Sequence, residues 1–247
     1  MQETLLHVSN VYKSYGKSTV PSLDGVSFTV EKGEIVGVFG PNGAGKTTLI
    51  SILSSILEPT LGSVVYHLDG EKSPREVRSN IGFVPQDFSF FPELTAKQNL
   101  SYFGNLYGLE REKLTQKMDE LLHKVGLFHV KNQKVATFSG GMKRRLNLII
   151  SLLHNPAILF LDEPTVGVDV QSKIAIMNLL QELNKQGTTI IYTSHHLKEA
   201  EEFCNQIILI DHGKIIASNT LTSLLNQYQV TNLEDLILQL TGTLLRD

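Results

Sequence analysis

The residues with the clearest chemistry form a phosphate-binding loop. Every fixed position of the pattern G-x-x-x-x-G-K-[ST] is matched by the run Gly40-Pro41-Asn42-Gly43-Ala44-Gly45-Lys46-Thr47. The apolar residues 34–39 before it predict a buried strand, and residues 48–53 after it predict a helix. Strand, loop and helix N-terminus form a site for a nucleoside triphosphate, because inward-pointing backbone N–H groups and the helix dipole both attract phosphate.

Three consecutive side chains have defined roles in such a site. Lys46 would reach the β- and γ-phosphates, and the Thr47 hydroxyl would bind Mg²⁺. Thr48 opens the helix whose N-terminus faces the phosphates. The alternative is a glycine-rich turn that only caps a helix, which the complete octapeptide in its strand-loop-helix setting disfavours. We therefore predict that the chain binds a nucleoside triphosphate.

A second apolar run, residues 157–161, predicts a buried strand that ends in two carboxylates, Asp162 and Glu163. Asp162 would hold Mg²⁺ next to Thr47, directly or through water. Glu163 follows it and would polarise an attacking water as a general base. A helix cap or a surface pair of carboxylates is the alternative, and the phosphate loop favours the metal and base roles.

The run Ser139-Gly140-Gly141 precedes a helical pattern and offers a second helix N-terminus that can bind an anion. With its neighbours Phe138 and Met142, this run resembles the signature of the nucleotide-binding subunits of ABC transporters. That signature usually reads Leu-Ser-Gly-Gly-Gln, so both neighbours depart from it, while the part that contacts phosphate is intact. The nucleotide implied by this resemblance is ATP.

The resemblance implies roles for four further residues. Tyr15 matches the aromatic residue that stacks on adenine, although strands also favour tyrosine. Gln86 matches the catalytic glutamine that touches Mg²⁺ and begins the loop facing the transporter. Asp169 matches the acidic residue of the loop after the catalytic carboxylate, among the nucleotide-binding residues. His195 matches the switch histidine that contacts the γ-phosphate, and its neighbour His196 stands where many relatives carry Asp.

The family arrangement implies a composite site in a dimer of two such ATPase subunits, identical or different. Two ATP molecules are sandwiched head to tail, so ATP closes the dimer and hydrolysis loosens it. One chain would supply the phosphate loop, Asp162, Glu163 and His195, and the other would supply Ser139, Gly140 and Gly141.

Charge gives no sign of a nucleic-acid partner. The 247 residues carry a formal net charge of −3. The basic run Lys143-Arg144-Arg145 lies on one helical turn, and we expect it to be a solvated helix face. No apolar run approaches the ~18 residues that span a bilayer. We expect a cytoplasmic subunit, held at the inner face of the membrane by a permease that is a separate polypeptide.

Strand and helix patterns along the chain predict an α/β fold. Short strands with tight turns at the start predict an antiparallel β subdomain, and strands alternating with helices predict a P-loop NTPase core with a mostly parallel sheet. We expect the ATPase domain to span residues 1–227. It would comprise a core (1–86 and 154–227) with a helical subdomain (87–153) inserted, followed by a short helical tail (228–247).

The loop after Gln86 carries Phe88, Phe90 and Phe91, which either belong to the core of the helical insert or line a groove for a helix of the membrane partner. The last residues resemble the tail of bacterial drug-, lipid- and antibiotic-type ABC exporters, which implies export. A single motif set without sustained heptads argues against ABC-type translation factors and DNA-repair clamps. The signature run and His195 argue against a small-molecule kinase.

The tail has one apolar stripe at helical spacing. Its charged and amide residues lie off the stripe, and Arg246 is its one basic residue, whereas a helix on a membrane surface is rich in Lys and Arg. We therefore expect the stripe to dock on the protein's own surface or across the dimer. Its members are Leu233, Leu236, Ile237, Leu240 and Leu244.

Overall fold

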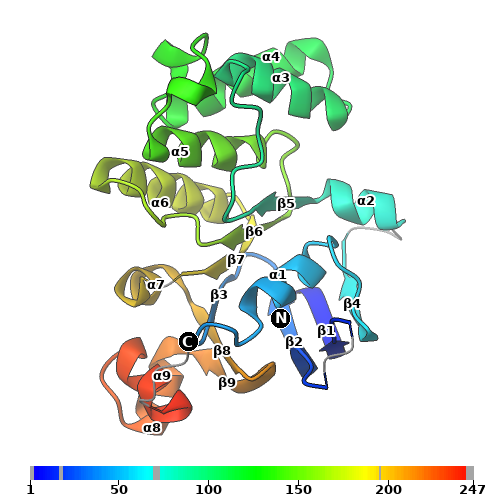
Figure 1. Cartoon of the computed structure of the whole chain (residues 1–247), viewed down its shortest axis with the longest axis vertical. Helices are drawn as coiled ribbons and strands as arrows, with labels where there is room; N and C mark the ends of the chain where they lie inside the picture. Colours follow the sequence, from blue (N-terminus) through cyan, green and yellow to red (C-terminus); the bar gives the residue numbers. More distant parts are fainter. Residues whose placement is uncertain (1–2, 17–18, 69–72, 195, 243–247) are drawn as a thin grey trace.

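The computed structural model describes residues 3–16, 19–68, 73–194 and 196–242. Two sheets and a group of helices make up this part of the chain (Figure 1). Figure 1 shows the helices α3, α4 and α5 beyond the β5 edge of the larger sheet, and α8 and α9 at the opposite end beside β8 and β9.

The larger sheet has six strands in the order β5-β6-β7-β3-β8-β9. Neighbouring strands are parallel from β5 to β8, and β9 runs antiparallel to β8. Every residue of β3, β6 and β7 is buried, as expected for strands covered on both faces. The strands are β3 (Ile35–Phe39), β5 (Ile81–Val84), β6 (Ile158–Asp162), β7 (Thr189–Thr193), β8 (Gln206–Asp211) and β9 (Lys214–Thr220).

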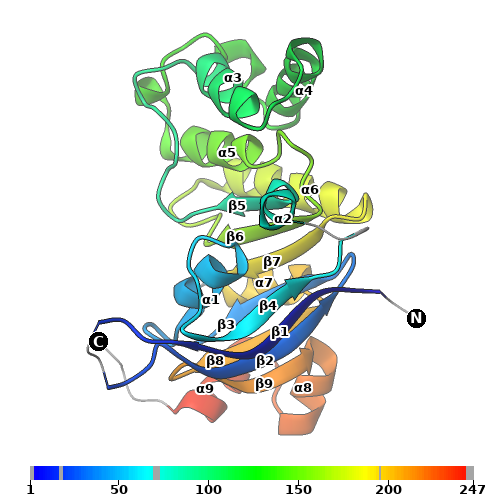
Figure 2. The ribbon, with the colours of Figure 1, turned by 90° about the vertical axis from the view of Figure 1, so that its right-hand side faces the viewer.

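The smaller sheet is antiparallel, with the order β2-β1-β4. It comprises β1 (Thr4–Lys13), β2 (Leu23–Glu31) and β4 (Leu61–Tyr66). Its strands cross the lower half of the molecule in Figure 2. Buried side chains of this sheet, of helix α1 (Lys46–Leu53) and of the larger sheet form one hydrophobic cluster, so α1 is fixed between the two sheets. This packing fixes the helix that follows the phosphate loop.

The helices α3 (Ala96–Leu106), α4 (Arg111–Lys124) and α5 (Gly140–Ile150) lie between β5 and β6 in the chain. A capping box starts α3, where Gln98 N donates to Thr95 Oγ1 at 3.1 Å and Thr95 N donates to Gln98 Oε1 at 2.8 Å. Short 3₁₀ turns at Phe128–Val130 and Val135–Thr137 lead into α5. These helices share a second hydrophobic cluster with the other face of the larger sheet.

The expected fold class is confirmed, with an antiparallel subdomain, a mostly parallel sheet and an inserted group of helices. The sequence patterns did not indicate the antiparallel edge strand β9 or the short helices α2 (Pro74–Ser79) and α8. We propose the division into a core (1–86 and 154–227), a helical subdomain (87–153) and a tail (228–247). The helices α3, α4 and α5 fall within the proposed subdomain. The remaining helices are α6 (Val170–Lys185), α7 (Leu197–Phe203), α8 (Leu221–Tyr228) and α9 (Leu233–Thr241).

Helix α9 docks on the protein's own surface, against α7 and α8, as its apolar stripe predicts. Leu233 and Leu236 are fully buried, and Ile237 and Leu240 are partly buried against the same cluster. Leu244, the last member of the stripe, lies outside the described residues. Within the described ranges, no helix is both long and apolar enough to cross a bilayer.

Replacing Leu236 by Asp should release α9, because a buried carboxylate without a partner is poorly tolerated. The cost should be at least the roughly 2–5 kcal/mol of a buried Leu→Ala change. Limited proteolysis should then cut the chain between α8 and α9 while the rest stays folded. Leu238→Asp is the matched control, since Leu238 is 44% exposed on the same helix. Equal protease resistance of both variants would show that α9 docking does not depend on the stripe.

Candidate functional site

The phosphate loop, residues 40–47, connects the carboxyl end of β3 to α1. Gly40 and Gly45 have φ of 153° and 107°, values that side chains rarely tolerate. A Cβ at Gly40 would lie 2.0 Å from Ile210 O, and one at Gly45 would lie 2.5 Å from Ser22 O. Both glycines are therefore required by backbone conformation and by close packing against the neighbouring chain.

Lys46 lies folded over its own loop. Its side chain is largely buried, and Nζ donates to the carbonyl oxygens of Gly40 at 2.8 Å and Pro41 at 3.0 Å. Burial lowers the pKa of Lys46, and the negative charges of Glu163 and Asp162 partly oppose that shift. An ammonium held by two neutral carbonyls can exchange them for a phosphate oxygen, which is a stronger acceptor.

The sheet register brings the two carboxylates to the phosphate loop. Thr193, the last residue of β7, pairs with Val38 on one side and with Asp162 on the other. Thr193 Oγ1 donates to Asp162 Oδ1 at 2.8 Å and accepts from the backbone N–H of Glu163 at 3.1 Å. The hydroxyl of Thr193 therefore orients both carboxylate residues at the edge where β3 ends.

Glu163 has a left-handed backbone, with φ of 51°, which is a strained conformation for a residue with a side chain. Its carboxylate accepts from Gln86 Nε2 at 3.4 Å. The turn directs the carboxylate out of the sheet and toward the loop after β5. Sequence spacing alone does not show this contact, because Gln86 and Glu163 lie in distant parts of the chain.

These groups line one cavity of about 570 Å³. It brings together most of the phosphate loop, Thr48, Gln86 and Glu163, whereas Asp162, the last residue of β6, is buried and does not line it. A cavity of this size fits a small-molecule ligand. Its lining is Ser22, Asn42, Gly43, Ala44, Gly45, Lys46, Thr47, Thr48, Gln86 and Glu163.

Tyr15 lies beside this cavity. Its hydroxyl is 3.4 Å from Thr48 Oγ1, and the residue is 47% exposed. The Lys13 ammonium lies 5.5 Å from the centre of the ring. An exposed ring next to the phosphate loop is open to stacking by a flat aromatic group.

The signature run lies away from this cavity. Ser139 is exposed and caps α5, accepting from the backbone N–H of Met142 at 3.2 Å. Gly140 follows at the exposed helix start, and Gly141 packs where a Cβ would lie 2.2 Å from Ser172 Oγ. The helix N-terminus therefore faces outward from its own chain.

Asp169 also lies outside the cavity and caps α6. Its carboxylate accepts from the backbone N–H of Ser172 at 2.9 Å and from the Ser172 hydroxyl at 2.8 Å. These hydrogen bonds lower the pKa of Asp169. The structure thus gives Asp169 a local role at the start of α6, next to Gly141.

The expected switch histidine, His195, lies outside the described residues. Among the described residues, Glu199 of α7 is mostly buried and contacts the strand β7. Glu199 Oε1 accepts from Tyr192 OH at 2.7 Å and from Thr165 Oγ1 at 3.1 Å, and Lys173 pairs with the same carboxylate. This network links β7, α7, α6 and the loop after Glu163. The sequence carries no signal for it, because its members share no motif.

The basic run of α5 is not a solvated face, and the expectation from sequence is wrong there. Arg144 is 5% exposed and donates to the carbonyl oxygens of Pro85 and Gln86. Arg145 Nη1 donates to Val125 O at 2.6 Å. The reason is that α5 lies beside the loop after β5 and the end of α4, whose backbone carbonyl oxygens accept from these two guanidinium groups.

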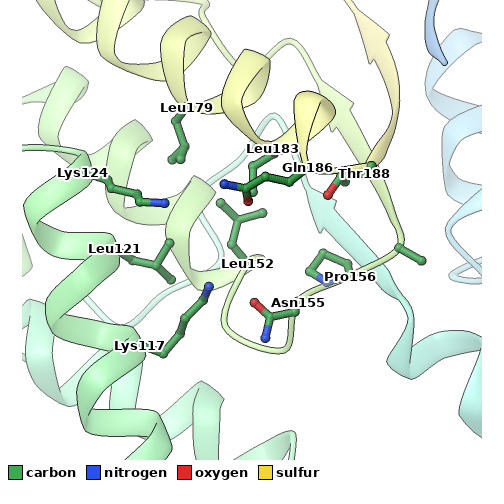
Figure 3. A pocket seen from close by; sticks show the side chains of 12 residues that line it. Lys117, Leu121, Lys124, Leu152, Asn155, Pro156, Leu179, Leu183, Gln186 and Thr188 are labelled. Carbon is green, nitrogen blue, oxygen red and sulfur yellow. The ribbon is translucent and has the colours of Figure 1, made fainter. Parts of the chain in front are cut away.

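A second cavity, of about 290 Å³, lies between α4, the end of α5 and α6 (Figure 3). Figure 3 shows Lys117 and Lys124 on one side and leucines such as Leu152 and Leu183 on the other. Lys124 pairs with Glu120 at 3.0 Å and with Glu182 at 2.8 Å. Its ammonium is thus neutralised, and no residue of the phosphate loop lines this cavity.

The sequence pattern of the ABC transporter family matches residues 23–166. The linearmycin resistance ATP-binding protein of Bacillus subtilis is 41% identical over 96% of this chain and 75% of that protein. The chain belongs to the ABC transporter family. A solved ATP-binding subunit of an ABC transporter superposes with a TM-score of 0.87 at 28% identity, covering 96% of this chain and all of the other.

A second solved relative is a dimeric ATP-binding cassette in a post-hydrolysis state with ADP and Pi. It superposes with a TM-score of 0.78 at 29% identity, covering 88% of this chain and 99% of that one. The chain is therefore an ATP-binding subunit with the fold of an ABC ATPase. We propose that its nucleotide site is the cavity that the phosphate loop lines.

Replacing Lys46 by Ala should weaken ATP binding by about 10- to 100-fold, since a hydrogen bond to a charged group contributes about 1.5–3 kcal/mol. Isothermal titration calorimetry with ATP measures the change. Lys32→Ala is the matched control, because Lys32 forms a surface ion pair with Glu3 at 2.9 Å and lies outside the cavity. Equal ATP affinities of the two variants would refute the role of Lys46.

Proposed function

We propose that this chain hydrolyses ATP with Mg²⁺ and so powers export through a separate membrane permease. The observation that carries the hydrolytic role is the Glu163 carboxylate in the same cavity as Lys46 and Thr47, in contact with the amide of Gln86. A base next to a phosphate loop suits attack by water on the γ-phosphate.

The oxygen donors near the loop fit Mg²⁺. Thr47 and Gln86 line the cavity, and the buried Asp162, which directly precedes Glu163, accepts a hydrogen bond from Thr193 with one oxygen. Within the described ranges, no group of three or more His, Cys, Asp or Glu residues forms a closed metal site. Mg²⁺ typically uses one or two carboxylates together with substrate phosphates, so Thr47, Gln86 and Asp162 would hold it. When bound, it would neutralise charge on the β- and γ-phosphates.

The chain's own residues would perform the remaining steps. The backbone N–H groups of residues 40–47 and Lys46 bind the phosphates, and the exposed ring of Tyr15 stacks on adenine. Glu163 accepts a proton from the attacking water while the water oxygen bonds to the γ-phosphorus. The bond between the γ-phosphorus and the β–γ bridging oxygen breaks, and ADP leaves. Gln86 orients Glu163 through the contact at 3.4 Å. His195, by resemblance, contacts the γ-phosphate.

The outward-facing helix N-terminus at Ser139 supports a composite site. It carries an anion-binding start without lining the cavity of its own chain. In a head-to-tail dimer, identical or mixed, Ser139, Gly140 and Gly141 would contact the γ-phosphate held by the other subunit. Asp169, which lies beside Gly141, would then stand at the dimer interface near the nucleotide. The dimeric relative with ADP and Pi supports this arrangement.

The proposed contact with the permease is the aromatic surface formed by Phe88, Phe91 and Tyr102. These side chains are 43%, 42% and 44% exposed, and Phe91 packs edge-on against Tyr102 with ring centres 5.0 Å apart. Phe90 instead packs against the core, as the first interpretation of this loop predicts, and the interpretation as a partner groove remains the proposal for the exposed rings. Exposed aromatic residues on one surface favour a protein partner. Docking there would hold the subunit at the cytoplasmic side of the membrane.

Replacing Glu163 by Gln should lower ATP hydrolysis by about 10²-fold or more, because the amide cannot accept the proton. ATP should still bind, and a dimer stabilised by ATP should accumulate in size-exclusion chromatography. Glu182→Gln serves as control, since that glutamate lies on the surface of α6 and pairs with Lys124. Turnover by the Glu163 variant at the rate of the unchanged protein rules out Glu163 as the base.

The composite site predicts complementation between two inactive chains. Mixing Ser139→Arg with Lys46→Ala gives mixed dimers in which one site carries both lesions and the other carries neither. Phosphate release should partly recover in the mixture, while two differently tagged Lys46→Ala chains should show no recovery. A mixture as inactive as each variant alone, with mixed dimers present, argues against the head-to-tail arrangement.

A further inference from the structure

Two side chains of helix α5 form hydrogen bonds with backbone groups of the loop after β5. Arg144 Nη1 donates to Gln86 O at 2.8 Å and to Pro85 O at 3.2 Å. Asn147, one turn further along, donates to Pro85 O at 3.3 Å and accepts from Ser89 N at 3.2 Å. The backbone of residues 85–89 is therefore tied to α5 from both ends.

The Arg144 guanidinium is costly to bury. Burial lowers the pKa of Arg144, and the negative charges of Asp87, Glu163 and Asp162 partly oppose that shift. The guanidinium carbon also lies 5.0 Å from the ring centre of Phe88. A well-packed apolar side chain usually stabilises a core as well as a buried charge does. Packing alone therefore gives no reason for an arginine at this position.

The hydrogen bonds from Arg144 to the carbonyl oxygens of Pro85 and Gln86, here called the clamp, connect three parts of the proposed site: the start of α5, Gln86 and the aromatic surface. Arg144 lies five residues after Ser139, about 7.5 Å along the helix that Ser139 begins. The residue it clamps, Gln86, contacts Glu163 through its side chain. The ring that it faces, Phe88, belongs to the aromatic surface. A shift of α5 must therefore move Gln86 and Phe88 with it or break the clamp.

We propose that Arg144 is a positioning residue that couples the start of α5 to Gln86 and, through it, to Glu163. This inference rests on the proposed dimer, in which Ser139 faces the ATP held by the other subunit. Phosphate bound there fixes α5, and the clamp then places Gln86 against the base of the chain's own site. ATP bound at one site thereby affects the catalytic residues of the other site. A displacement of α5 would also move Phe88, which lies on the surface proposed to contact the permease.

Steady-state ATP hydrolysis by Arg144→Lys and Arg144→Gln tests the coupling. Lysine keeps the charge, but its compact ammonium cannot replace the planar guanidinium that bonds two carbonyls and stacks on a ring. We expect kcat to fall about tenfold or more in both variants, since small misplacements of reacting groups are costly. The Hill coefficient for ATP should fall toward 1, and the Kd for ATP should change less than about twofold.

Lys143→Gln is the matched control, because it removes one positive charge from the same helical turn without touching the loop. Thermal unfolding and the Kd for ATP identify a variant that has merely lost its fold. If both Arg144 variants are folded and keep the parental kcat and Hill coefficient, the inference is wrong. If the unchanged protein itself fails to hydrolyse ATP, the proposed function fails, and this inference with it.

A fluorescent probe tests the coupling independently of turnover. The chain contains no tryptophan, so Phe88→Trp places a single reporter beside Arg144. In a Glu163→Gln background, adding ATP should shift its emission as the dimer closes. Arg144→Gln in that background should abolish most of the shift while ATP still binds. An equal shift with and without Arg144 overturns the coupling.

Discussion

The register of the parallel sheet is the constraint on which the rest of the site depends. Thr193 pairs with Val38 and with Asp162, so the carboxyl ends of β3, β7 and β6 lie level. The phosphate loop and Glu163 therefore meet at one edge, although they are distant in sequence. A slip of one residue would turn each buried side chain of these strands to the opposite face and into contact with other packing partners.

Buried charge is the second feature of this edge. Lys46, Asp162 and Arg144 are each at least nine-tenths buried, and the carboxylates Asp162 and Glu163 oppose the effect of burial on both basic groups. Removing one charge would therefore disturb the others. The site is therefore one electrostatic unit, and we propose that a phosphate replaces the carbonyl oxygens to which Lys46 donates.

Local patterns predicted much of this molecule. The octapeptide, the apolar strands before it and before Asp162, and the part of the helical stripe from Leu233 to Leu240 each depend on neighbouring residues. Each of these elements lies where expected. What could not be predicted depends on contacts distant in sequence. The burial of Arg144 depends on the carbonyl of Gln86, and the burial of Glu199 depends on Tyr192, Thr165 and Lys173. The sequence does not identify the partner of a basic or acidic residue when that partner lies far away in the chain.

The most direct test of the account is a crystal structure of the Glu163→Gln variant with ATP and Mg²⁺. We expect Lys46 Nζ to leave the carbonyl oxygens of Gly40 and Pro41 and to contact a phosphate oxygen. The backbone N–H groups of residues 40–47 should surround the phosphates, and Ser139 of a second chain should face the γ-phosphate. A triphosphate bound elsewhere, or one bound in this cavity while Lys46 still donates to its own loop, would contradict the account.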